Sequence, residues 1–298
     1  MLRIMPELPD ITAYIEALRP RIVGQPVQNI RLQSPFLLRT FDPPPESTVG
    51  KPVIDVSRLG KRIGIHCEDE LYLVLHLMIA GRLHWKEAGA RLSSKQQLAA
   101  FDFPTGSLVL TEAGTKKRAS LHIAQGRDAF EAHRPPGLEV LDCTEKQFVA
   151  RLRSANHTLK RALTNPRLFS GIGNAYSDEI SHRAGLSPVM LTSRLDDESA
   201  SRLFNATREV MREWIERLRL ENGEEFPKTV TAFRPEMAVH GRYGLPCPVC
   251  QTPVQRIRYA ENETNYCARC QNGGRVLADR SLSRLLKDDW PRRIEDWE

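Results

Sequence analysis

Four cysteines near the carboxyl end constrain the fold of this chain more than any other feature. They form two Cys-x-x-Cys pairs, Cys247/Cys250 and Cys267/Cys270, with sixteen residues between the pairs. Two such pairs at this spacing place four thiolates around one tetrahedral Zn²⁺. Because all four ligands are sulfur, the site is closed to substrate, and we expect one structural zinc. Four unrelated thiols, or a redox dithiol that needs only one pair, are the weaker alternatives.

The residues between the two cysteine pairs alternate in the manner of a β-hairpin. Residues 254–258 and 264–266 show this alternation, which is typical of half-buried strands. Such a hairpin could present basic residues, Arg258 among them, to a phosphate backbone. The chain is basic as a whole, because 43 Lys and Arg against 37 Asp and Glu give a formal net charge of +6. This surplus is compatible with a polyanionic partner but does not require one.

The rest of the chain divides into a β-rich half and a helical half. A first helix is expected to begin behind Asp10 and to end at Pro20. Short apolar runs separated by turn residues follow over 27–111, a pattern that predicts a sandwich or a barrel. Beyond an expected linker at 132–137, AHRPPG, the pattern becomes helical, with its clearest apolar stripe over 203–218.

No segment predicts a membrane span. The longest apolar run, 71–80, falls well short of the roughly 20 residues that a bilayer requires, and it resembles a buried strand. The N-terminus lacks the apolar core of a secretory signal. We therefore expect a cytoplasmic protein, in which the six cysteines are metal ligands or buried thiols instead of disulfides.

A second motif that carries chemistry is Pro6-Glu7-Leu8-Pro9-Asp10, directly after Met5. If translation starts at Met5, removal of the methionine exposes a proline with a secondary amine. An α-amine has a pKa of roughly 7.7–8, so a sizeable fraction is neutral and nucleophilic at physiological pH. The alternative is a proline-rich lead into a helix.

A third motif runs from Lys160 through Gly171-Ile-Gly-Asn-Ala-Tyr-Ser-Asp-Glu179. A glycine-bearing turn that opens onto a helix directs backbone N–H groups and a positive dipole outward, which suits a DNA phosphate. A helix–turn–helix of this kind occurs in many folds and is weakly specific by itself.

Taken in order, these motifs resemble the formamidopyrimidine-DNA glycosylase / endonuclease VIII family of base-excision repair enzymes. PELPD resembles the family's opening PELPE, and GIGNAYSDEI resembles its helix–two-turn–helix signature. HGRYGLPCPVC through NYCARCQ resembles its zinc finger, and HLMIAGR resembles the strand that ends near the lesion pocket. The resemblance implies an α+β fold, in which an N-terminal β-sandwich domain precedes a helical domain with a helix–two-turn–helix and a β-hairpin zinc finger, with DNA bound between the two.

The same resemblance implies where the domains divide. Residues 5–131 would form the catalytic β-sandwich domain, 138–238 the helical DNA-binding domain and 239–274 the zinc finger. A C-terminal tail, 275–298, would follow; its leucines at 282, 285 and 286 fit a helix.

Three residues would carry the chemistry if the family's roles are transferred. Pro6 would be the nucleophile that attacks C1′ of the damaged nucleotide, and Glu7 the general acid that helps to open the sugar. Lys61 would contact phosphate near the lesion and assist elimination; the alternative is a solvated basic turn. The resemblance assigns DNA binding to Lys160, Asn174, His76, Arg118 and Arg258, with His76 equally compatible with a satisfied core histidine.

Several positions depart from the family pattern. Four residues precede Met5, and if they are retained Pro6 lies in an amide and the lyase chemistry is lost; we expect translation to start at Met5. Ile79 stands where the family often has a methionine that fills the hole left by the flipped base. In this chain, Ile79 and Arg118 could fill that hole. Residues 223–238 do not match the loop that caps 8-oxoguanine in one branch. Asn262 replaces the finger arginine, which implies weak δ-elimination.

We therefore expect a bifunctional DNA glycosylase and abasic-site lyase that acts on damaged DNA as a monomer. A lesion-binding protein of the same fold that has lost catalysis is the main alternative, because the finger and loops are altered. A zinc-ribbon protein of RNA or the transcription machinery is the alternative from another class, but it leaves PELPD and GIGNAYSDE unexplained.

Overall fold

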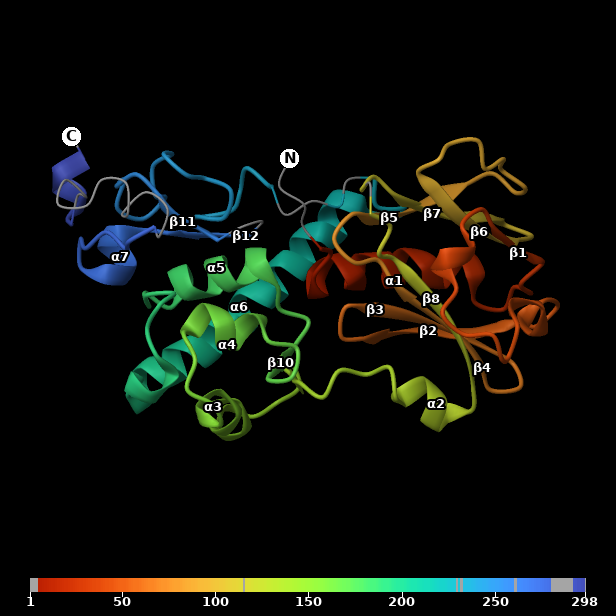
Figure 1. The fold of residues 1–298 in the computed structure, drawn as a ribbon, viewed down its shortest axis with the longest axis horizontal. Coiled ribbons are helices and arrows are strands. Elements are labelled where there is room, and N and C mark those ends of the chain that lie inside the picture. The colour runs from red at the N-terminus through yellow and green to blue at the C-terminus, as the bar shows by residue number, and fades with distance from the viewer. Residues whose placement is uncertain are drawn as a thin grey trace. The chain divides into compact units, whose positions relative to one another are not determined.

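The computed structural model describes residues 5–114, 116–228, 230, 233–259, 262–279 and 292–297 (Figure 1). These residues form two compact units. The N-terminal unit contains residues 5–135 together with 214–230, and the C-terminal unit contains residues 136–213 together with those from 233 onward. No helix in these ranges is both long and apolar enough to cross a membrane.

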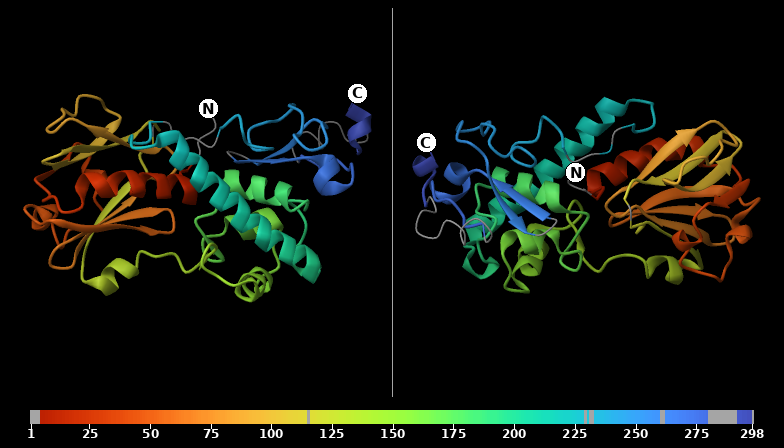
Figure 2. Two further views of the ribbon diagram at one scale, coloured as in Figure 1. Left: turned by 180° about the vertical axis from the view of Figure 1, so that it is seen from behind. Right: turned by 45° about the horizontal axis from the view of Figure 1, so that its top comes forward.

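The N-terminal unit consists of two four-stranded antiparallel sheets and a long helix (Figure 2). One sheet has the order β2-β3-β4-β8, with strands Val53–Leu59, Arg62–Cys67, Leu71–His76 and Ser120–Gln125. The other has the order β1-β6-β7-β5, with strands Asn29–Leu32, Gln97–Phe103, Gly106–Glu112 and Gly81–Lys86. The helices are α1 Leu8–Ile22 and α2 Arg127–Glu131, with short 3-10 turns η1 Pro35–Leu37 and η2 Pro45–Thr48.

A single core holds these sheets and α1 together. Alternation along each strand directs every second side chain inward. Ile63 and Leu75 of one sheet, Phe101 of the other, and Ile11 and Leu18 of α1 are fully buried in one cluster. The predicted β-sandwich is confirmed, with α1 as part of its core.

The expected limits of the first helix are wrong at both ends. Glu7, not Asp10, is the N-cap: its side chain accepts the backbone N–H of Asp10, and the Asp10 carboxylate accepts the Glu7 N–H at 2.9 Å. This reciprocal capping box starts the helix earlier. Pro20 lies inside α1, which continues to Ile22; a proline costs one hydrogen bond and crowds the carbonyl four residues earlier, and here the helix ends within its next three residues.

The C-terminal unit is mainly helical and ends in a small hairpin module. Thr144 and Gln147 form the capping box that the sequence predicts at the start of its first helix. The helices are α3 Glu145–Arg153, α4 Leu159–Thr164, α5 Asn174–Arg183, α6 Asp197–Asn222 and α7 Ala268–Asn272, with η3 Thr192–Arg194 and η5 Ile294–Trp297. The strands are β9 Leu138–Glu139, β10 Phe169–Ser170, β11 Gln255–Tyr259 and β12 Asn262–Tyr266.

The helical content of this unit, together with the sheets of the other, confirms the α+β fold class. Helix α6 contributes its residues from Trp214 onward to the N-terminal unit. Strands β11 and β12 pair antiparallel, which confirms the predicted hairpin. The helix expected around residues 282–286 lies outside the described residues.

Candidate active site and nucleic-acid interface

Pro6 and Glu7 lie directly before α1 in the N-terminal unit. Both residues are buried, and Glu7 is only 1% exposed. The capping box with Asp10 holds the Glu7 carboxylate at the first turn of a helix that is packed into the core. In the chain as given, the Pro6 nitrogen forms an amide with Met5. In a chain that begins at Pro6, an amine and a carboxylate would therefore be adjacent at a rigid helix start.

Lys61 occupies the tight turn between β2 and β3. Gly60 has a φ of 63°, a left-handed conformation that favours glycine, and Leu59 pairs with Arg62 across the turn. Helix α1 packs against both strands. His76 ends β4 directly opposite Arg62. Burial, Arg62 and Lys61 lower the pKa of His76 to about 4, so this imidazole is neutral at physiological pH and lies close to Lys61.

A sharp turn connects β4 to β5 and contains Ile79. The N–H of Gly81 donates to the Leu77 carbonyl at 2.9 Å, and Met78 has a φ of 53°. A Cβ on Gly81 would lie 2.1 Å from the Leu77 oxygen, so only glycine fits. A bulky residue with positive φ is uncommon and often marks a functional segment.

Arg118 is exposed, and the backbone of its segment is hydrogen-bonded to the buried carboxylate of Glu112. Glu112, at the end of β7, is 2% exposed. Its two carboxylate oxygens accept the Arg118 N–H at 2.9 and 3.0 Å, and one of them accepts the Ala119 N–H at 3.2 Å. Lys117 donates to the Glu112 carbonyl. Glu112 therefore fixes the backbone that presents Arg118.

In the C-terminal unit, Lys160 and Asn174 meet at the N-terminus of α5. The Lys160 ammonium donates to the Asn174 carbonyl at 2.5 Å and pairs with the fully buried Asp178 carboxylate at 2.6 Å. The Asn174 side chain donates to the carbonyl of Glu263 on β12 at 2.9 Å. Lys160 therefore fixes the first turn of α5, and Asn174 connects that turn to the hairpin.

Two consecutive acids of α5 anchor the segment that leads into the finger. The second oxygen of Asp178 bonds His240 Nδ1 at 2.7 Å and accepts the Asn265 N–H at 3.1 Å. Glu179 accepts the N–H groups of Ala238, Val239 and His240 at 2.7 to 2.9 Å. Burial raises the pKa of Glu179, against the effect of these donors. Both acids are buried, so the helix and the hairpin module form one hydrogen-bonded body.

The four predicted metal ligands converge beside this body. The sulfurs of Cys247, Cys250, Cys267 and Cys270 all lie within 4.8 Å of one another. The sulfurs of Cys247 and Cys270 are 3.9 Å apart, and those of Cys250 and Cys267 are 3.4 Å apart. Tetrahedral zinc with bonds of about 2.3 Å requires sulfur separations of about 3.8 Å. The donor set therefore fits zinc, and the predicted single structural zinc is confirmed.

A second set of contacts orients the finger against α5. His182 Nε2 lies 3.3 Å from the Cys247 sulfur, and Gln271 donates to the Leu186 carbonyl at 2.9 Å. Burial lowers the pKa of His182 to about 4, so its neutral ring can donate an N–H to the thiolate. Such partners of metal ligands fix their orientation.

The basic residues of the hairpin differ in availability. Arg256 stacks on the Tyr243 ring at 4.1 Å and lies 3.5 Å from the Glu263 carboxylate. Arg258 is exposed, while its backbone N–H is held by Asp279 at 2.7 Å. The side chain of Asn262 lies outside the described residues; its backbone opens β12 opposite Tyr259.

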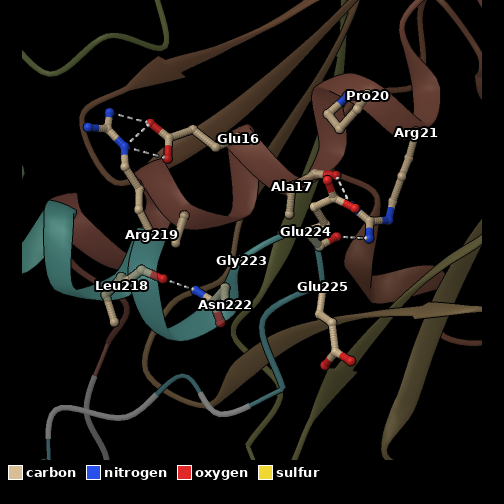
Figure 3. A pocket seen from close by; sticks show the side chains of 11 residues that line it. Glu16, Ala17, Pro20, Arg21, Leu218, Arg219, Asn222, Gly223, Glu224 and Glu225 are labelled. Carbon is tan, nitrogen blue, oxygen red and sulfur yellow. Dashed lines mark hydrogen bonds and ion pairs between the residues drawn. The ribbon is translucent and has the colours of Figure 1, made fainter.

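A surface pocket of about 490 Å³ lies where α1 meets the end of α6 in the N-terminal unit (Figure 3). Arg219 pairs with Glu16 through bonds of 2.6 to 3.0 Å, and Arg21 donates to the Glu224 carbonyl at 2.6 Å. Arg219 thus ties α6 to α1, and Arg21 holds the segment that follows α6 against the same helix. The following segment packs Phe226 against Tyr14, with ring centroids 5.7 Å apart.

Sequence reasoning missed the buried acids Glu112, Asp178 and Glu179, and it missed His240. Two of the acids lie inside the GIGNAYSDE motif, where adjacent carboxylates follow Ala175, Tyr176 and Ser177 on a helix and precede Ile180. Acids in that setting are buried only when they are paired, which is the signal that could have identified them. Glu112 and His240 have no comparable local signal.

Comparisons with known proteins cover most of the chain. Residues 5–120 match the formamidopyrimidine-DNA glycosylase N-terminal domain, 137–221 its H2TH domain, and 244–273 a zinc finger found in FPG and IleRS. The formamidopyrimidine-DNA glycosylase of Thermus thermophilus is 31% identical over 280 residues, which cover 91% of this chain and all of the relative. An uncharacterized formamidopyrimidine-DNA glycosylase-like protein of Mycobacterium tuberculosis is 36% identical over 151 residues, 51% of this chain and 94% of that protein.

Solved structures show the same relationship. The MutM (Fpg) protein of Thermus thermophilus is 29% identical, with a TM-score of 0.74 and coverage of 89% of this chain and 98% of that one. An Fpg mutant of Lactococcus lactis, in complex with a Fapy-dG containing DNA, is 25% identical, with a TM-score of 0.77 over 90% of this chain and 100% of that one. The chain therefore belongs to the formamidopyrimidine-DNA glycosylase family of base-excision repair enzymes.

Proposed function

We propose that this protein is a bifunctional DNA glycosylase and abasic-site lyase, which removes oxidised bases and nicks the strand by β-elimination. The observation that carries the proposal is Pro6 and Glu7 at the start of α1, with Lys61 in the turn that joins the two strands against which that helix packs. The family relationship and the damaged DNA in the Lactococcus lactis complex support damaged DNA as the partner.

The chemistry requires a free N-terminal amine, which proline supplies as a secondary amine, so the active form begins at Pro6. The amine attacks C1′ as the bond from C1′ to the base breaks, and the departing base takes up the proton that the amine releases. Glu7 donates a proton to the sugar ring oxygen, which opens the ring and leaves an iminium between Pro6 and C1′. Loss of a C2′ proton then expels the 3′ phosphate, and water hydrolyses the iminium to free the amine.

The remaining site residues hold phosphates. Lys61 would contact the backbone near the reacting sugar and assist elimination, and His76 would contact the backbone beside it. Asn174 presents the N-terminus of α5 to phosphate, and Lys160 supports this contact by fixing the Asn174 carbonyl. Arg118 and Arg258 are exposed and would contact DNA from the β7–β8 segment and the finger.

These roles divide the chain by function. We assign catalysis to residues 5–131 and phosphate binding to 138–238. The zinc finger, 239–274, would contact DNA, and the tail, 275–298, follows it.

Borohydride trapping on DNA with an abasic site tests the proposal, because only an amine nucleophile becomes covalently attached. Protein that begins at Pro6 should be trapped, and Pro6→Gly should retain some trapping through a primary amine. Protein that carries residues 1–5 should not be trapped. Equal trapping of both forms would assign the nucleophile to a lysine such as Lys61. Damage-specific binding without any trapping would identify a lesion-binding protein of the same fold.

A further inference from the structure

The C-terminal tail, 275–298, folds back onto the zinc finger in the parts of it that the structure describes. The match to the family's finger ends at residue 273, before the tail begins. Arg275 pairs antiparallel with Arg293, and the Val276 N–H donates to the Arg292 carbonyl at 2.9 Å. The short helix η5 lies beside α7 (Figure 1). The tail is therefore an addition to the matched finger, and it returns to that finger.

The β11–β12 hairpin of the finger has two different faces. Cross-strand partners share a face, and so do alternate residues of one strand. Ile257 of β11 and its partner Thr264 therefore point to the same side as Tyr266 of β12. Arg258 and its partner Glu263 point to the opposite side. The arginine that we expect to contact DNA thus lies on the face away from Ile257 and Tyr266.

The tail covers the face that carries Ile257 and Tyr266. Ile294 of η5 is 7% exposed and shares one buried cluster with these two residues. Val276 and Leu277 pack against the same cluster, and the Leu277 N–H donates to the Tyr266 hydroxyl at 2.7 Å. A two-stranded hairpin is only marginally stable by itself in water. The tail therefore supplies a second layer for this hairpin.

A buried carboxylate of the tail also holds the backbone of Arg258. Asp279 is 2% exposed, and its carboxylate accepts the Arg258 N–H at 2.7 Å. A carboxylate is a strong acceptor for a backbone N–H. The Arg258 guanidinium is exposed and has no hydrogen-bond or ion-pair partner among the described residues. Asp279 therefore fixes the main chain of Arg258, while the side chain stays available to a ligand.

The other arginine of the hairpin is engaged within the finger. The Arg256 guanidinium stacks on the Tyr243 ring and lies 3.5 Å from the Glu263 carboxylate. Arg258 is therefore the hairpin arginine that can meet a phosphate without first breaking contacts inside the finger.

We propose that the tail positions the finger on DNA, and that Asp279 is the positioning residue that sets the backbone of Arg258 so that its guanidinium meets a phosphate. The inference rests on the proposed function, in which Arg258 contacts damaged DNA. A carboxylate is repelled by phosphate, so Asp279 acts through Arg258 and not by touching DNA. Its removal should weaken DNA binding, although the loss of a negative charge alone would strengthen it.

Fluorescence anisotropy, with a duplex that contains an uncleavable abasic-site analogue, measures Kd between about 50 and 200 mM salt. Loss of one phosphate contact reduces the slope of log K against log salt by about 0.9, so a variant's deficit shrinks about threefold over this range. Arg258→Gln should show this reduced slope, and Asp279→Ala should reproduce it. Asp279→Asn keeps an oxygen that can accept the Arg258 N–H, and it should bind like the wild type.

A double-mutant cycle separates positioning from general support of the finger. If Asp279 acts through Arg258, the two residues serve one contact, and the double variant should bind no more weakly than Arg258→Gln. Additive losses, or loss of zinc from Asp279→Ala, would show a purely structural role and overturn the proposal. An unchanged salt slope in Asp279→Ala would overturn it too, as would equal weakening by Asp279→Asn.

Asp296→Ala is the matched control, because Asp296 is an exposed tail carboxylate that accepts the Arg293 N–H at 3.0 Å, outside the hairpin. Its salt slope should equal that of the wild type. Borohydride trapping of protein that begins at Pro6 tests the proposed function separately. Trapping with a salt slope that does not depend on Asp279 would contradict only the role of the tail. No trapping, with a slope that depends on Asp279, would contradict the lyase and keep the role of the tail.

Discussion

At the scale of single residues, a few side chains determine what the site can do because they are held by their neighbours. Glu7 would otherwise be a solvated carboxylate, but its reciprocal bonds with Asp10 fix it at the first turn of α1. Glu112 does the same for the backbone at Arg118. In both cases a carboxylate sets the position of a chemically important group through bonds to nearby backbone N–H groups, and the helix cap at Glu7 is worth about 1 kcal/mol.

The first prediction concerns Asn262. The family pattern has an arginine here that reaches the phosphates beside the lesion and is implicated in δ-elimination. A neutral amide supplies no charge and no bidentate contact. Arg256 cannot readily replace the arginine, because it stacks on Tyr243 and lies beside Glu263, whereas Arg258 is exposed. We therefore expect β-elimination products to outnumber δ-elimination products.

Asn262→Arg should increase the δ product and steepen the salt dependence of DNA binding by about one unit of slope. Resolving the cleaved strands on a gel distinguishes an unsaturated aldehyde end from a phosphate end. Arg258→Gln is the control: it changes the charge of the same hairpin at another position, so it separates an effect of position 262 from an effect of hairpin charge. Predominant δ product from the wild type, unchanged by Asn262→Arg, would contradict this interpretation.

At the scale of elements, α5 connects the DNA-binding turn to the finger. Its N-terminus carries Asn174, its middle carries Asp178 and Glu179, and His182 near its end contacts a zinc ligand. One helix thus sets the positions of the phosphate-binding turn, the hairpin and the metal cluster. Breaking a buried ion pair such as that of Asp178 with Lys160 typically costs about 3–5 kcal/mol, which makes this helix sensitive to substitution.

The second prediction concerns zinc. The hairpin module has only a small apolar cluster around Val239 and Val254, so metal binding should supply much of its folding free energy. Chelation, or Cys250→Ser, should remove one zinc and most of the DNA affinity, while the β-sheet signal of the N-terminal unit remains. Zinc content, circular dichroism and DNA binding measure the three effects. Cys143→Ser, at a buried cysteine outside the cluster, should retain zinc. Full affinity in metal-free protein would contradict the prediction.

The elements were largely predictable where periodicity or a local motif identifies them. Strand alternation, the Thr144 capping box and the spacing of Cys247 to Cys270 all act over a few residues, and the structure agrees with each. The start of α1 was mispredicted because two acids, Glu7 and Asp10, compete for the cap. The partners Lys160–Asp178 and Asp178–His240 are 18 and 62 residues apart, and a single sequence gives no signal for such pairing.

At the scale of the whole molecule, the charge around the histidines makes both folding and DNA binding depend on pH. Within the net charge of +6, burial together with Arg62 lowers the pKa values of His76 and His122 in the N-terminal unit, and Lys61 adds to the effect on His76. In the DNA-free protein, keeping these imidazoles neutral lowers the free energy of unfolding below about pH 6.5. Bound phosphate would relieve this loss, so folding and DNA binding should respond to pH in opposite directions.

The last prediction is that the N-terminal unit of the DNA-free protein becomes less stable as the pH falls from 7 to 5. Burial and nearby cations lower the pKa of His76 to about 4, whereas in the unfolded chain it returns to about 6.5. In this window the unfolded state binds more protons than the folded state, so the free energy of unfolding rises with pH and falls on acidification. His76 should contribute about 2 kcal/mol between pH 7 and 5, and the more exposed His122 less, because solvent screens it.

Hydrogen exchange of peptides from β3, β4 and β8, corrected for the intrinsic rate and recorded without phosphate, measures this loss of stability. His76→Gln should flatten the pH dependence, because glutamine does not titrate, and a bound abasic-analogue duplex should reduce it. The lowered pKa of Asp102, where Arg31 and Ser107 outweigh burial, affects stability only below about pH 4 and does not confound the window. Equal slopes for the wild type and His76→Gln would show that His76 has the same pKa in the folded and unfolded protein and would exclude it as the source of the acid sensitivity.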